Sequence, residues 1–90
     1  MRIFQATDVD GSVVLRVEGQ VRDQWVVELR HVSSEILQKS ASRLVLDLAE
    51  VSFIDADGLE LFRELSSRHV SLSNCSLFVT QQLKALEEKR

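Results

Sequence analysis

The segment from Leu44 to Phe62 places the strongest constraint on what this chain can fold into. It begins with "LVLDL", Leu44–Leu48, which is almost continuously apolar, as in a strand that is covered on both faces. The turn Asp55–Gly58 follows, and apolar residues then recur at helical spacing, including Leu59 and Phe62. A strand that leads directly into a helix predicts an α/β fold, with Leu44–Leu48 as a central strand.

The N-terminal third predicts a β-hairpin followed by a helix. Two segments rich in strand-forming residues, Arg2–Thr7 and Ser12–Glu18, flank Asp10-Gly11, and Asp-Gly is a strong hairpin signal because both residues tolerate positive φ. Asp23 is the expected N-cap of a helix that runs to about Lys39. The expected apolar face of this helix consists of Trp25, Leu29, Val32 and Ile36.

The C-terminal half predicts two more helices and one more strand. A short loop, "KSAS", precedes the central strand, and the helix that starts after Asp55 is expected to end near His69. Ser76–Val79 is interpreted as the last strand, and Thr80 as the cap of a final helix, Gln81–Lys89. The chain is therefore expected to form one domain, residues 1–90. Its fold is a mixed sheet of about four strands, an N-terminal hairpin and then parallel strands, with about three main helices.

Composition excludes several classes of function. The 90-residue chain is 44% hydrophobic and 28% charged with a formal charge of −3, which gives no electrostatic case for nucleic acid. Its apolar runs are far shorter than the ~20 residues of a membrane span. A single cysteine, Cys75, is expected to be buried and inert, as in a reducing compartment. A cytoplasmic protein without membrane insertion is therefore expected.

The chain lacks the usual signatures of catalysis, cofactors and metals. It has no G-x-G-x-x-G motif, no phosphate-binding lysine loop and no cluster of His and Cys residues, and His31 and His69 are interpreted as structural or solvated. A receiver-type phosphoacceptor domain fits poorly, because a hairpin stands where that fold needs a βα unit and its Mg²⁺-binding acids. We expect neither an enzyme, nor a cofactor, nor a metal site.

The turn Asp55–Gly58 is the candidate site. Ligands and partners of α/β sheets tend to meet loops at the carboxyl ends of strands. Asp55 is the expected N-cap, Asp57 lies in the first helical turn where it interacts favourably with the helix dipole, and Gly58 allows a close approach. These same residues also suit a well-started helix with no further role, and spacing alone does not separate the two interpretations.

The segment "RLVLDLAEVSFIDADGLELFREL" resembles the core of the STAS domain, the fold of anti-sigma factor antagonists. "VVLRVEGQV" is similar to the second strand of that family, with Gly19 on its glycine. The resemblance covers most of Met1–Lys89 and implies the same order of strands and helices. It also implies a bacterial-type signalling protein that regulates transcription through protein–protein interaction.

The family's phosphorylation site has no hydroxyl here. In this resemblance Asp55 matches the family's Asp, Ala56 stands where the family has a phosphorylatable Ser or Thr, and Gly58 matches its glycine. No phosphorylation is expected at Ala56. Asp57 is interpreted mainly as a helix-starting carboxylate, with weak imitation of a phosphate as the alternative.

The resemblance therefore implies a non-enzymatic module that binds an anti-sigma factor or kinase-like regulator. The expected contact residues are Ile54, Asp55, Ala56, Asp57, Gly58, Leu59 and Phe62. Within the same fold, the alternative is the small STAS subunit of a phospholipid ABC transport complex, which docks on an ATPase subunit. A small-ligand or nucleotide-binding domain is the alternative of another class, although two carboxylates at the turn would repel a phosphate.

Family members often continue beyond the third long helix, whereas this sequence stops at Arg90. A shortened fold is expected to leave apolar surface uncovered, which favours a homo-oligomer or a permanent partner.

Overall fold

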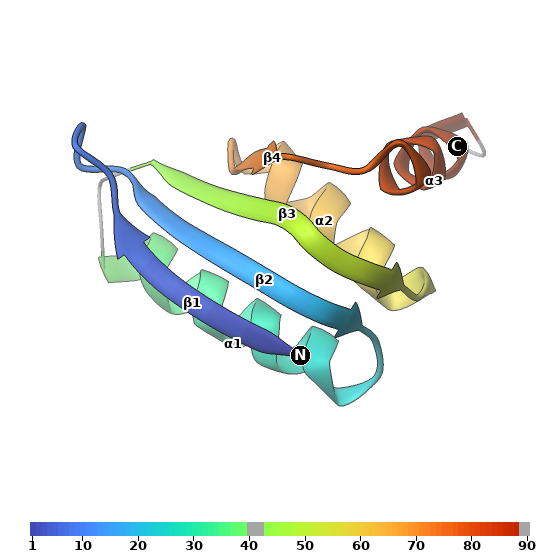
Figure 1. Ribbon diagram of the computed structural model, residues 1–90, viewed down its shortest axis with the longest axis horizontal. Helices are drawn as coiled ribbons and strands as arrows, with labels where there is room; N and C mark the ends of the chain where they lie inside the picture. The colour runs from blue at the N-terminus through green and yellow to red at the C-terminus, as the bar shows by residue number, and fades with distance from the viewer. Residues whose placement is uncertain (40–42, 89–90) are drawn as a thin grey trace.

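The computed structural model describes residues 1–39 and 43–88 (Figure 1). Its elements are, in chain order, β1 (Arg2–Thr7), β2 (Val13–Val21), α1 (Gln24–Lys39), β3 (Leu44–Ile54), α2 (Ala56–Ser67), β4 (Ser71–Ser73) and α3 (Leu77–Glu88). This confirms the predicted order of strands and helices. The loop expected around Ser40–Ser42 and the helix end expected at Lys89 lie outside the described residues.

The N-terminal hairpin forms as predicted from Asp10-Gly11. Strands β1 and β2 pair antiparallel, from Arg2 opposite Glu18 to Thr7 opposite Val13. Gly11 has a φ of +87°, which few residues other than glycine adopt, and its N–H donates to the Asp8 carbonyl at 3.0 Å. The Ser12 N–H donates to the Asp10 carboxylate at 2.9 Å, so both residues of the Asp-Gly pair hold the turn.

The four strands form one mixed sheet in the order β1-β2-β3-β4, in which β2, β3 and β4 are parallel. Helices α1 and α2 lie on the same side of it (Figure 1). Each new parallel strand is added in the same direction, so right-handed crossovers place the connecting helices on one face. The predicted mixed sheet and the central position of β3 are confirmed.

The prediction that Leu44–Leu48 is covered on both faces was wrong. Burial alternates along β3, with Leu44, Leu46 and Leu48 buried and with Val45 and Asp47 only partly buried. The difference follows from the layering. Helices α1 and α2 cover one face of the sheet, and the alternate residues of β3, Val45 and Asp47, point to the other face. The same face of β2 carries Arg16 and Glu18, which form an ion pair at 3.0 Å.

The core lies between the sheet and helices α1 and α2. On α1 the buried residues are Val26, Leu29 and Ser33. The buried face is therefore rotated about the helix axis relative to the predicted face, and Trp25 is only half-buried. Helix α2 buries Leu61, Phe62 and Leu65 against the strands. Burial of apolar area, at about 25 cal/mol per Å², is the main favourable term in folding, and in this core it comes from the strands as well as from both helices.

The position of the last strand was predicted wrongly. The structure places β4 at Ser71–Ser73, and α3 begins at Leu77, where the sequence suggested a strand over Ser76–Val79. Ser76 caps this helix: its Oγ accepts from the Val79 N–H at 3.1 Å, and Thr80 lies inside the helix. A short apolar run fits a buried strand or a helix equally well, so periodicity could not separate them.

Candidate functional site

Asp55 holds the turn between β3 and α2 together. It has extended backbone angles (φ −84°, ψ −179°), and its Oδ1 accepts from the Gly58 N–H at 2.8 Å, which confirms the predicted N-cap. Its Oδ2 accepts from the Asp23 N–H at 2.9 Å, and its own N–H donates to the Val21 carbonyl at 3.1 Å. One residue therefore fixes both the start of α2 and the loop that follows β2.

Asp23 does not cap α1 in the way predicted. It directly precedes the helix, but its φ is +53°, and its carboxylate accepts from Arg22 Nε at 3.0 Å. Its carbonyl accepts from the Val26 N–H at 3.1 Å. The Asp23 N–H, which donates to the Asp55 carboxylate, belongs to this left-handed conformation. Such a conformation costs free energy in a residue other than glycine.

Gly58 is required by the packing beneath the turn. A Cβ added to this buried residue would lie 2.8 Å from Ile54 Cγ2 and 3.0 Å from the Val21 carbonyl oxygen. Both distances are shorter than ordinary van der Waals contacts. The close approach predicted at Gly58 is therefore found, and the neighbours that approach are strands β2 and β3.

The exposed part of the turn is smaller than the predicted set of contact residues. Ala56 and Asp57 are exposed, and Asp55 and Leu59 are half-buried. Three of the predicted contact residues, Ile54, Gly58 and Phe62, belong to the interior. They lie on the sheet-facing side of the strand end and the helix, so they support the turn and offer a partner no surface of their own.

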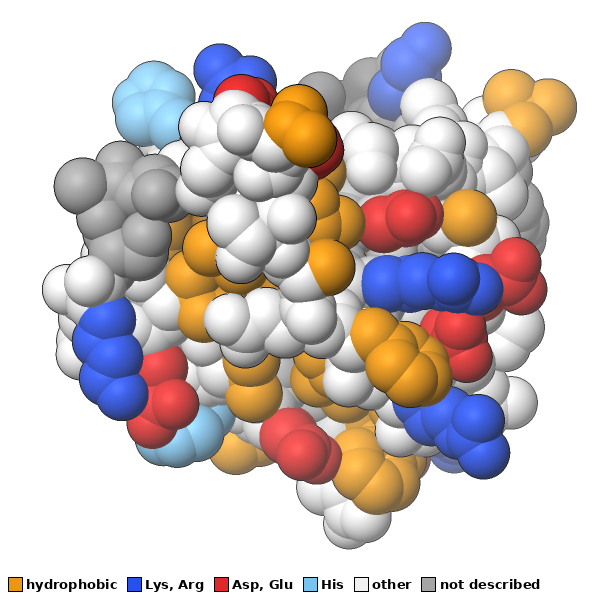
Figure 2. Space-filling view, turned by 60° about the vertical axis from the view of Figure 1, so that its left-hand side comes forward, with side chains coloured by type: hydrophobic (Ala, Val, Ile, Leu, Met, Phe, Trp, Pro, Cys, Tyr) orange, Lys and Arg blue, Asp and Glu red, His pale blue; other side chains and the backbone are white. Residues whose placement is uncertain are grey.

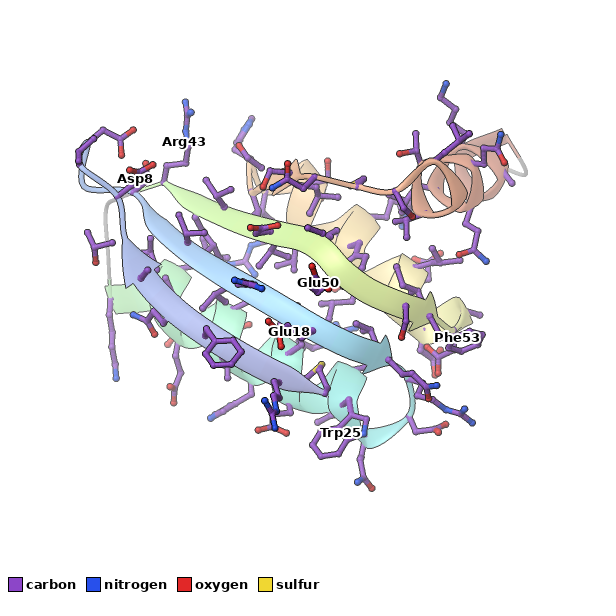
Figure 3. The ribbon with its side chains drawn as sticks, in the orientation of Figure 1. Asp8, Glu18, Trp25, Arg43, Glu50 and Phe53 are labelled. Carbon is purple, nitrogen blue, oxygen red and sulfur yellow. The ribbon has the colours of Figure 1, made fainter. Side chains whose placement is uncertain are left out.

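Two residues beside the turn were missed by the sequence analysis. Phe53 is 40% exposed at the end of β3 (Figure 3), and the Arg22 guanidinium carbon lies 5.7 Å from the centre of its ring. The register between β2 and β3 shifts between Gly19 and Gln20, and Phe53 pairs with Gln20. An irregularity in strand pairing changes the face to which side chains point. Ser52 and Phe53 are neighbours in sequence and are both exposed, so the alternation of buried and exposed residues is interrupted here. Phe53 lies two residues before the cap Asp55, and no sequence signal separated it from its buried neighbour Ile54.

The described residues offer no constellation for metal chemistry or for crossing a membrane. No group of three or more His, Cys, Asp or Glu side chains in this part of the chain could hold a metal ion. None of the described helices is long and apolar enough to span a bilayer. Cys75 is half-buried, not fully buried as expected, and desolvation raises the pKa of its thiol.

The chain is similar to known proteins both in its sequence family and in its structure. A model of the STAS domain family matches residues 4–89. No curated protein sequence matches significantly. Two solved structures of SpoIIAA have the same fold. The anti-sigma factor antagonist SpoIIAA in its unphosphorylated form is 22% identical with a TM-score of 0.67, over 92% of this chain and 82% of that one.

The second structure is that of the Bacillus cell fate determinant SpoIIAA in its phosphorylated form. It is 21% identical with a TM-score of 0.65, over 92% of this chain and 81% of that one. At this identity the two structures establish the fold, and the family match spans nearly the whole sequence. The chain therefore belongs to the STAS domain family.

Proposed function

We propose that this protein is a non-enzymatic interaction module that resembles an anti-sigma factor antagonist. It binds a regulatory protein, of the anti-sigma factor or kinase-like kind, through the exposed turn at the start of α2. Family membership supports the proposal, as does the fold shared with SpoIIAA, which is described as an anti-sigma factor antagonist. In this role it acts in cytoplasmic signalling that regulates transcription.

The observation that carries the proposal is the rigid presentation of Ala56 and Asp57. Both are exposed, while the residues on either side, Asp55 and Gly58, are tied by the 2.8 Å capping bond. A turn that is already ordered loses little conformational entropy when a partner binds. The surface is therefore suited to recognition.

Binding is proposed to be independent of phosphorylation at position 56. Solved structures of SpoIIAA include an unphosphorylated and a phosphorylated form. Ala56 has no hydroxyl that could accept a phosphoryl group, so that change of charge cannot occur at this position. The negative charge of the turn comes from Asp55 and Asp57, and of these two Asp57 is the exposed one.

The chemistry of the surface indicates what a partner must offer. Asp57 forms no ion pair in the described part of the chain, and Phe53 presents an exposed ring next to the turn. Charge complementarity calls for a basic side chain opposite Asp57, and an apolar pocket would bury the ring. We propose that Phe53 and Arg22 extend the contact surface beyond the turn.

The decisive experiment is a binding titration with purified candidate regulators encoded beside this gene, either a histidine-kinase-like ATPase or an ABC ATPase subunit. Asp57→Lys reverses the charge at the centre of the surface, so we expect about a tenfold or greater loss of affinity. The matched control is Asp8→Lys, which makes the same change of charge at the hairpin, at the opposite end of the sheet from Phe53 (Figure 3). Its affinity should equal that of the wild type.

Two results would contradict the proposal. An Asp57→Lys variant that binds as the wild type does would remove the turn from the interface. Tight binding of a nucleotide or of inorganic phosphate, measured by calorimetry, would favour a small-ligand domain instead. Circular dichroism of each variant checks that the fold is retained.

A further inference from the structure

Among the residues that the structure describes, none pairs with the outer edge of strand β1, and this edge could accept another strand. Strand β1 is the first strand in the sheet order, so β2 pairs with only one of its two sides. Its sequence, "RIFQAT", contains no proline and only one charged residue, Arg2, and Phe4 is 48% exposed. Natural proteins usually protect such edges with charge, proline or a covering segment. Unprotected edges pair with other strands.

A groove lies beneath this edge, between β1 and helix α1. Two cavities of about 250 and 290 Å³ occupy it and share Gln5 as a lining residue. Their apolar lining comes from both layers, namely Met1, Ile3, Val13, Leu15, Val32 and Ile36. Figure 2 turns the left-hand side of the molecule forward and shows hydrophobic surface in the middle of the face, with basic and acidic side chains at its lower left.

The two ends of the groove carry opposite charges on α1. Glu28 lines one cavity and Lys39 lines the other, and both side chains are exposed. Neither forms an ion pair within the described residues. Exposed Glu35 also lines the Lys39 cavity, and its carboxylate lies 3.1 Å from His31 Nε2, a contact that is an ion pair only when His31 is protonated. At 1.5 Å per residue, Glu28 and Lys39 are separated by about 16 Å along the helix. Gln5 lines both cavities and therefore lies between the two ends of the groove.

We infer that a second copy of this chain occupies the edge and closes the groove. Two β1 strands pair antiparallel about a two-fold axis near Phe4, so that each Phe4 ring faces its counterpart. The two sheets then form one continuous sheet, and the α1 helices run antiparallel beneath it. Under this symmetry Glu28 of each copy faces Lys39 of the other.

Charge complementarity selects a second copy in preference to an unrelated strand. A peptide strand would satisfy the backbone of β1 but would leave Glu28 and Lys39 without partners. A two-fold pairing forms both Glu28–Lys39 contacts at once and buries both Phe4 rings. The site around Asp57 lies beyond β2 and β3 and stays open, so the dimer does not depend on the proposed function.

The test is sedimentation equilibrium of the full chain and of charge-reversed variants. The wild type should be a dimer at micromolar concentration. Glu28→Lys and Lys39→Glu should each raise the dimer dissociation constant about tenfold or more, because each places like charges together twice. The double variant restores opposite charges and should recover most of the loss. Lys84→Glu, an exposed charge reversal on α3, is the control and should have no effect.

A second variant tests the strand pairing itself. Phe4→Glu places two carboxylates opposite each other at the two-fold axis, and it should yield a folded monomer because Phe4 is outside the core. Any one of three results would overturn the inference. The wild type could be monomeric at several hundred micromolar, the double charge swap could bind no better than the single variants, or the dimer could survive Phe4→Glu.

Discussion

At the scale of single residues, Asp55 does the most to shape the candidate site. Its two carboxylate oxygens serve different segments: one caps α2 through Gly58, and the other holds the backbone of Asp23. A capping Asp was predictable from its place before the helix. The second bond, across 32 positions of sequence, depends on β2 and β3 ending side by side.

Asp55→Ala removes both bonds and should lower the free energy of unfolding by about 1–2 kcal/mol. Asp55→Asn separates the two contributions, because its carbonyl oxygen can still cap α2 while its amide cannot accept from the Asp23 N–H. Urea denaturation of the three proteins measures the difference. If Asn proves as damaging as Ala, the capping bond contributes little and the contact to Asp23 dominates.

At the scale of elements, the short strand β4 depends on a side chain of its neighbour. Asp47 on β3 accepts from Asn74 Nδ2 at 3.0 Å and from the Ala49 N–H at 3.1 Å. These two bonds favour the ionised carboxylate and lower the pKa of Asp47 below its ordinary value of 3.8, the bond from Asn74 being the larger cause. Asp47 therefore links the β3–β4 pairing to pH.

A carboxylate with a lowered folded-state pKa stabilises the fold above its unfolded pKa, and this contribution disappears as pH falls through the folded pKa. Asn74→Ala should therefore raise the pKa of Asp47 toward 3.8 and make the loss of stability on acidification below that pH smaller. NMR titration of the carboxyl group and urea denaturation at each pH provide the measurements. An unchanged pKa would show that Asn74 does not hold the charge.

In the molecule as a whole, one layer of helices covers one face of the sheet. This layer contains a buried polar group without a hydrogen-bond partner among the described residues. Ser33 on α1 is fully buried beneath the sheet, and its hydroxyl has no hydrogen-bond partner in the described structure. A buried polar group without a partner costs about 1–3 kcal/mol. This serine is where the core departs most from apolar packing.

Ser33→Ala should raise the free energy of unfolding by about 1 kcal/mol, since it removes the unpaired hydroxyl and adds helix propensity. Thermal denaturation should show an increase of roughly 4–8 °C for a domain of this size. Ser34→Ala, one residue along and only half-buried, is the control: it gains the same helix propensity but removes no buried unpaired hydroxyl, so its increase should be the smaller one. A destabilised Ser33→Ala protein would mean that the hydroxyl is hydrogen-bonded in solution.

Local sequence was sufficient to predict the order of elements, the hairpin at Gly11 and the cap at Asp55. These depend on residues close together in the chain, and turn chemistry and periodicity report them directly. The tertiary structure was needed to place β4, because Ser71–Ser73 becomes a strand by pairing with the edge of β3. It also decided that Phe62 is buried while Phe53 is exposed, because the face a side chain turns to depends on strand register and on which side the helices pack.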